Sequence, residues 1–237
     1  MHQSVTEVIE NGSKLVAFMR ADENGRYRSW EHCYSAFAGH KDKTFSEEDL
    51  DFLCLHLSFY LASWGMYRGS SFLLQKDYRV HATAIKELLN PDYIDLWAVK
   101  CEDYTHNHIK LQKLFSLSNA LKEIYSGIRI SANEAINCEI PAQPISDILI
   151  TKILMGTLGC VPAYDRYFKE GVKKYGVAAA LFTSRSIHNL SKYYVENSDD
   201  FESWRRTISC EGLEYPQMKV LDMCFWQLGH NLDLNNQ

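Results

Sequence analysis

The 237-residue sequence predicts an all-α protein, and three observations lead to this prediction. Apolar residues recur at helical spacing through most of the chain, and no segment shows the strict alternation expected of a half-buried strand. Apolar residues make up 46% of the chain, which is enough for a large core. No repeat, phosphate-binding loop, dinucleotide-binding glycine motif or serine-hydrolase motif occurs. We expect a compact single domain, residues 1–237, of about ten helices whose two lobes meet near 127–139.

Polar and glycine-containing segments separate the expected helices. Ser46, followed by acidic residues, marks one helix start, and the helix from Glu47 is apolar on nearly all sides, which places it at the centre of the N-terminal half. We expect Ser29 to cap the second helix, Gly12 to interrupt the first, and residues 197–204 to be a polar link. The expected helices cover residues 5–20, 29–38, 47–66, 79–89, 107–126, 177–195 and 216–229, together with the central segment described below.

Charge and cysteine content exclude several classes of protein. The net charge of −5 argues against nucleic-acid binding by bulk electrostatics, although it allows a local basic face. The chain has no run of about 18 apolar residues and no basic-then-apolar leader, so we expect a cytoplasmic protein without a membrane partner. Seven cysteines without a CxxC pair are typical of buried reduced thiols. His106 and His108 fit a solvated helix start, and we expect neither a metal nor a cofactor.

Residues 140–171 form the segment around which the rest of the chain is organised. Two prolines bend its start, Ser146 can cap the next helix, and residues 148–158 supply an apolar helix that must be buried. Pro162 is expected at the start of the following helix, with Asp165 in its first turn. An aspartate at this position is most often a cap or a partner of the helix dipole, which stabilises a helix by about 0.3–2 kcal/mol.

This segment resembles the helix-hairpin-helix DNA glycosylase superfamily over about 30 residues. Ile140-Pro141 stands in the leading position of the hairpin, ILITKILMGTLG resembles the buried helix, and VPAYDRYF resembles the segment that ends on an aspartate. The resemblance implies an all-α enzyme that takes double-stranded DNA with one base flipped out of the stack. It implies that Asp165 assists attack of water on the N-glycosidic bond. The residues that it implies for binding the DNA backbone are Ala142, Gln143, Ser146, Lys152 and Arg166.

The sequence departs from the family pattern in its hairpin. Family hairpins are rich in glycine so that backbone N–H groups approach a phosphate, whereas Ala142-Gln143-Pro144 stands here and Pro144 removes a donor. Bifunctional members carry a nucleophilic lysine about where Ser146 stands, so the resemblance implies a monofunctional enzyme. Lys152 lies nearly two turns later, where it is either structural or faces a phosphate.

The residues expected to bind the substrate lie in two places in the sequence. Trp64, Tyr67 and Arg68, bracketed by glycines after a central helix, can present a flat ring and a guanidinium fork to a cleft. The alternative interpretation of this group is a core tryptophan beside an arginine that reaches solvent. Tyr164, next to Asp165, is also expected to face the substrate. The aromatic segment 30–34 is a second candidate, with core packing as its alternative.

Three functions remain open at this point. The first is a monofunctional DNA glycosylase that removes a damaged or modified base, in repair or in defence against phage with modified DNA. The second is a non-catalytic all-α module that binds nucleic acid or protein, which the acidic net charge and the glycine-poor hairpin favour. The third is a helical ribonuclease that would use Arg26 and His32.

Overall fold

The computed structural model describes residues 4–41, 44–106, 108–135, 144–209 and 212–234, and it confirms the all-α prediction. These residues form eleven α-helices and four short 3₁₀ helices, and none of them lies in a β-strand. The helices are α1 (Val5–Ala21), η1 (Arg26–Arg28), α2 (Ser29–Ala38), α3 (Glu47–Ser63), η2 (Phe72–Gln75), η3 (Tyr78–His81), α4 (Ala82–Leu88), η4 (Pro91–Leu96), α5 (Cys101–His106), α6 (His108–Ala135), α7 (Asp147–Thr157), α8 (Arg166–Tyr175), α9 (Ser184–Glu196), α10 (Ser198–Ile208) and α11 (Gln217–Leu234).

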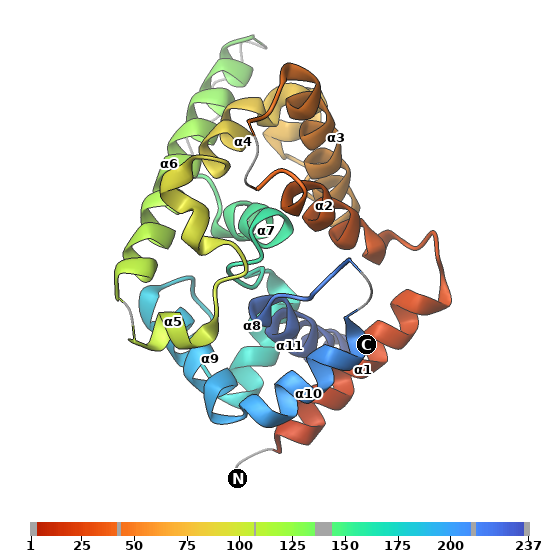
Figure 1. Ribbon diagram of the computed structural model, residues 1–237. Helices are drawn as coiled ribbons and strands as arrows, with labels where there is room; N and C mark the ends of the chain where they lie inside the picture. The colour runs from red at the N-terminus through yellow and green to blue at the C-terminus, as the bar shows by residue number, and fades with distance from the viewer. Residues whose placement is uncertain (1–3, 42–43, 107, 136–143, 210–211, 235–237) are drawn as a thin grey trace.

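Helix α7 lies near the centre of the molecule (Figure 1). Helices α2, α3, α4 and α6 surround it toward the top of the view, and α1, α5, α8, α9, α10 and α11 lie below it. All residues from Leu149 to Thr157 are buried, including the polar ones, because α2, α3 and α6 pack against α7. The expectation that this apolar helix must be buried is thereby confirmed. A side chain that projects from α7 into a pocket is therefore attached to a backbone that close packing holds in place.

The start of α8 is fixed against α11 by two glycines. A Cβ atom added at Gly171 would collide with the carbonyl oxygen of Phe225, and one added at Gly229 would collide with that of Tyr167. The two backbones therefore approach more closely than larger residues allow. This close approach brings the first turn of α8, which follows Asp165, alongside the side chains of α11.

Two expectations about connecting segments are wrong. Helix α6 continues through Gly127 to Ala135, although the expected helix ended at residue 126, because an isolated glycine lowers helix stability by only about 1 kcal/mol. Residues 198–208 form helix α10 in place of a polar link. Its buried residues Phe201, Trp204 and Ile208 recur at helical spacing among acidic neighbours, a pattern that the polar composition concealed.

Of the expected helix caps and breaks, one is confirmed and two are wrong. Ser46 caps α3 in a reciprocal capping box with Asp49, as the sequence predicts. Helix α1 runs through Gly12 without interruption. Ser29 does not cap α2, since it is already the first residue of the helix and makes no capping bond.

Two further findings concern the part of the chain that the structure describes. No helix there combines the length and the apolar character needed to cross a bilayer. The described cysteines are free and buried, and burial raises the pKa of each of their thiols.

Candidate functional site

A pocket of about 670 Å³ opens beside Asp165, where α7 and the first turn of α8 meet the turn that follows α3. Its volume falls within the range of about 300–1,000 Å³ that is usual for sites that take small molecules. Four basic side chains and one carboxylate line it, so its surface is locally positive although the whole chain is acidic. The lining residues are Arg26, Ala62, Ser63, Trp64, Gly65, Met66, Arg68, Ile148, Lys152, Asp165, Arg166, Tyr167 and Trp226.

Asp165 is both the cap of α8 and part of the pocket wall. One carboxylate oxygen accepts the backbone N–H of Phe168 at 3.1 Å, which confirms the capping role that position alone suggests. The other oxygen lies 3.6 Å from the ammonium of Lys152. Helix α8 begins at Arg166, directly after its cap Asp165. Pro162 therefore lies before the helix and not in its first turn, where it was expected. The Asp165 side chain is 14% exposed, and the pocket is the space that it faces.

Lys152 projects from the buried helix α7 to the base of the pocket. Its ammonium donates a hydrogen bond to the backbone carbonyl of Trp64 at 2.8 Å, in addition to its ion pair with Asp165. Burial lowers the pKa of Lys152, and the attraction of Asp165 opposes this effect. With its side chain only 6% exposed, Lys152 does not occupy the surface position that contact with the DNA backbone requires. The geometry favours the structural alternative for Lys152, which connects α7, the turn after α3 and the cap of α8.

The turn that carries Asp165 is tied to the core on two sides. The backbone N–H of Ala163 donates to the carboxylate of Asp222 at 3.0 Å, and the N–H of Tyr164 donates to the hydroxyl of Thr151 at 3.0 Å. Asp222 is itself paired with Lys219 at 3.0 Å. Burial raises the pKa of Asp222. These bonds hold the Asp165 backbone in place independently of its own side chain.

Tyr164 does not face the pocket, which corrects the expectation that it binds the substrate. It is fully buried, and its hydroxyl bonds to Ser186 at 2.8 Å. Its ring packs between Phe168 and Phe182, with ring centroids 5.2 Å and 5.4 Å away, and these contacts hold the side chain in the core.

Tyr67 is also turned away from the pocket, whereas Trp64 and Arg68 line it. The Tyr67 hydroxyl bonds to His81 at 2.8 Å, and His81 bonds to Tyr125 at 2.7 Å. Burial lowers the pKa of His81 to about 3, so this chain of side chains contains a neutral histidine. We conclude that Tyr67 belongs to the core beside the pocket.

The turn after α3 shapes one wall of the pocket. Gly65 has a φ of +76°, in the left-handed region that favours glycine. A Cβ atom at this position would lie 2.9 Å from Nε of Arg68, so the Arg68 side chain packs directly over the turn. Trp64 stands edge-on to Trp226, with 5.7 Å between ring centroids and an interplanar angle of 88°. A guanidinium and two indole rings therefore meet at one edge of the pocket.

Three of the aromatic and charged residues that line the pocket were not among the expected site residues. Tyr167 stands two positions after Asp165, and this proximity is a signal that the sequence contains. Trp226 lies 5.3 Å from Tyr167 by ring centroids but 61 positions beyond Asp165, and no local pattern indicates it. Arg26 was considered only for the ribonuclease hypothesis, yet it lines this pocket from η1.

The residues expected to bind the DNA backbone are dispersed. Ser146 is exposed and caps α7 by accepting the backbone N–H of Leu149 at 3.3 Å. Arg166 lines the pocket but bonds to Asp233 at 2.6 Å. Ala142 and Gln143 lie outside the described residues.

The remaining candidates have structural explanations. Trp30 is fully buried and donates to the carbonyl of Met155, so the aromatic segment 30–34 packs in the core as its alternative interpretation holds. Arg26 and His32 lie on different elements, η1 and α2, and His32 does not line the pocket of Arg26. The two residues therefore do not share one helix, as the ribonuclease hypothesis requires.

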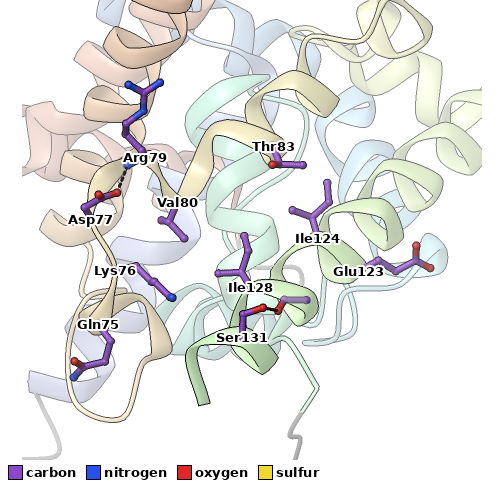
Figure 2. Close-up of a pocket in the computed structure, with 11 residues that line it drawn as sticks. Gln75, Lys76, Asp77, Arg79, Val80, Thr83, Glu123, Ile124, Ile128 and Ser131 are labelled. Carbon is purple, nitrogen blue, oxygen red and sulfur yellow. Dashed lines mark hydrogen bonds between the residues drawn. The ribbon is translucent and has the colours of Figure 1, made fainter. Parts of the chain in front are cut away.

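A larger pocket of about 850 Å³ lies between η3, the start of α4 and the middle of α6 (Figure 2). Its charged residues are not buried, and Arg79 is engaged by Asp51 at 3.2 Å. Other polar groups there bond locally, such as the Ser131 hydroxyl to the carbonyl of Gly127 at 3.1 Å. Because it contains no buried carboxylate or amine, it is a weaker candidate for chemistry than the smaller pocket at Asp165.

Within the described residues, no group of three or more histidine, cysteine or acidic side chains is arranged to hold a metal ion. Comparison of the chain with family models, with curated proteins and with solved structures finds no match. The function must therefore be argued from the pocket itself.

Proposed function

We propose that the protein is a monofunctional DNA glycosylase, which hydrolyses the N-glycosidic bond of a damaged or modified base in the pocket at Asp165. The observation that carries this proposal is a single carboxylate at the wall of a pocket of about 670 Å³, surrounded by indole rings and by arginines. No other described pocket combines these three features.

The pocket supplies what the reaction requires. Breaking an N-glycosidic bond develops positive charge on the sugar, and a carboxylate held close to that charge stabilises it. The same carboxylate can orient or deprotonate the attacking water. The bonds from Ala163 to Asp222 and from Tyr164 to Thr151 hold the Asp165 turn in place, so little reorganisation is needed when the substrate arrives.

The walls of the pocket suit a base that has left the duplex. Extruding a base costs a few kcal/mol, and stacking on an aromatic ring recovers about 1–3 kcal/mol. Trp64, Tyr167 and Trp226 are the aromatic residues that line the pocket. The four basic lining residues attract a polyanion to this face even though the chain has a net charge of −5.

The decisive experiment replaces Asp165 with asparagine. Asparagine can still accept the N–H of Phe168 and Lys152 keeps its bond to the carbonyl of Trp64, so we expect Asp165→Asn to fold, with a loss of stability because Lys152 no longer has a carboxylate partner. Release of base from a panel of duplexes with modified bases, detected as alkali-labile abasic sites, should fall by about 10²–10⁴-fold because the assisting carboxylate is lost. The control is Asp200→Asn, which removes the same charge from an exposed position on α10. Full activity of Asp165→Asn would refute the assigned role.

Borohydride treatment tests whether the enzyme is monofunctional. A water nucleophile leaves no imine, so we expect no covalent protein–DNA product. Lys152 is the amine nearest to Asp165 in the pocket, and burial lowers its pKa. A trapped product that disappears in Lys152→Met would replace the monofunctional mechanism with an amine-based one.

One observation favours a second candidate, a non-catalytic all-α module that binds nucleic acid. Asp165 already caps α8 and pairs with Lys152, and these roles suffice to explain its presence. This candidate predicts that the wild-type protein binds DNA but releases no base from any duplex in the panel, and that Asp165→Asn binds equally well.

A further inference from the structure

We propose that Arg26 and Arg68 form a phosphate-binding subsite at the edge of the pocket, which holds the phosphate of the nucleotide whose base enters. The inference deepens the proposed function and rests on it, because the phosphate belongs to the same nucleotide. The four basic residues that line the pocket differ in whether they form an ion pair with a carboxylate. Lys152 pairs with Asp165 and Arg166 pairs with Asp233, whereas neither Arg26 nor Arg68 has a carboxylate partner among the described residues.

Both arginines are held in position by neighbouring residues, and one terminal nitrogen of Arg26 donates a hydrogen bond to the hydroxyl of Tyr27 at 3.4 Å. Arg68 packs over Gly65, where a Cβ atom would lie 2.9 Å from its Nε. The guanidinium carbon of Arg26 lies 5.0 Å from the ring centroid of Tyr27, and that ring stands edge-on to Trp64 at 5.4 Å. A guanidinium that rests on a flat surface loses less conformational entropy when it binds an anion.

The residues around Arg26 and Arg68 indicate which class of anion the subsite would bind. Arginine forks match the oxygens of phosphate or carboxylate, but the pocket also offers indole rings to a flat group. A nucleotide combines a flat base with a phosphate, which satisfies both features. Asp165 repels an anion at the base of the pocket, so the phosphate is expected on the side of the arginines and the sugar beside the carboxylate.

The experiment measures binding of a DNA duplex that carries a tetrahydrofuran abasic analogue, which cannot be hydrolysed, by fluorescence polarisation at several salt concentrations. We expect Arg26→Gln and Arg68→Gln each to weaken binding by about tenfold and to lower the salt slope by about 1. The matched control is Arg185→Gln, which removes the same charge from an exposed position on α9 away from the pocket. Equal weakening in the control would mean that bulk charge alone is responsible and would overturn the proposal.

Neutral methylphosphonates in place of the phosphates that flank the analogue provide a second readout. They should weaken binding of the wild-type protein about as much as the arginine substitutions do, and should weaken the Arg26→Gln/Arg68→Gln double variant no further. A wild-type protein that releases base, together with arginine variants that bind normally, would refute the subsite and leave the proposed function standing.

A third arm separates DNA from a free nucleotide as the source of the phosphate. Thymidine 5′-monophosphate and thymidine are titrated into the wild-type protein, which is followed by tryptophan fluorescence. A preference for the monophosphate that Arg68→Gln abolishes, in a protein that neither binds DNA nor releases base, would support the subsite and reject the proposed function. No preference, combined with no binding of DNA, would reject both.

Discussion

Two lysine–aspartate pairs lie close to Trp64, and they differ in what surrounds them. Lys219 and Asp222 are one turn apart on α11, 3.0 Å from each other, with 4% and 6% of their side chains exposed. Lys152 and Asp165 join α7 to the cap of α8 at 3.6 Å, with 6% and 14% exposed. The first pair is sealed within the protein, whereas the second lines a pocket.

The difference shows that burial of an ion pair does not by itself mark a functional site. Asp222 accepts bonds from Lys219 and from the N–H of Ala163, and Lys219 lies 4.9 Å from the ring centroid of Trp30, so the sealed pair supports the core. The pair at the pocket has the same chemical groups but also has space for a third molecule. Access to a ligand, and not charge pairing, separates the two.

The largest effect on stability is expected from breaking the sealed pair. Lys219→Met leaves Asp222 buried without its cation, which should lower the free energy of unfolding by about 3–5 kcal/mol. Urea unfolding measures this loss, and a second replacement, Asp222→Leu, should restore part of it because no buried charge then remains. A loss below about 1 kcal/mol in Lys219→Met would remove the distinction between the pairs.

A smaller effect is expected at the pocket pair. Lys152→Met should change the free energy of unfolding by no more than about 1 kcal/mol, since it removes a cation whose burial is unfavourable and Asp165 keeps its bond to Phe168 and its opening to the pocket. The same urea measurement tests this expectation. If Lys152→Met were as unstable as Lys219→Met, the pocket pair would be structural in the same sense as the sealed one.

The smallest effect is a dependence on alkaline pH. Burial holds the pKa of folded Lys152 below its ordinary value of 10.5, so between the two values the unfolded chain binds more protons. The contribution of Lys152 to stability therefore rises as pH rises through this window and is constant on either side. We expect the stability of wild type relative to Lys152→Met to increase between neutral pH and pH 10.5 in paired urea titrations. A decrease would mean that the attraction of Asp165 outweighs burial.

Several parts of the site could be predicted from the sequence, and the two errors about tyrosine side chains share one cause. Trp64, Arg68 and Asp165 are marked by glycines and by a helix start, which are local signals. Tyr164 and Tyr67 were inferred from their closeness in sequence to those residues, but their side chains point into the core. Adjacency along the chain does not fix the direction of a side chain, because that direction depends on the backbone angles at each residue.

The sequence by itself determined that the chain folds into helices, that the apolar segment after Ser146 is buried, and that Asp165 stands at the start of a helix. These features depend on the spacing of apolar residues and on caps, which act over a few positions. Only the tertiary structure decided that Arg26, Lys152 and Trp226 meet Asp165 at one pocket while Lys219 and Asp222 are sealed beside it. The physical reason is that these contacts join distant segments, and the close packing of α8 on α11 and the burial of α7 set which of them face a common space.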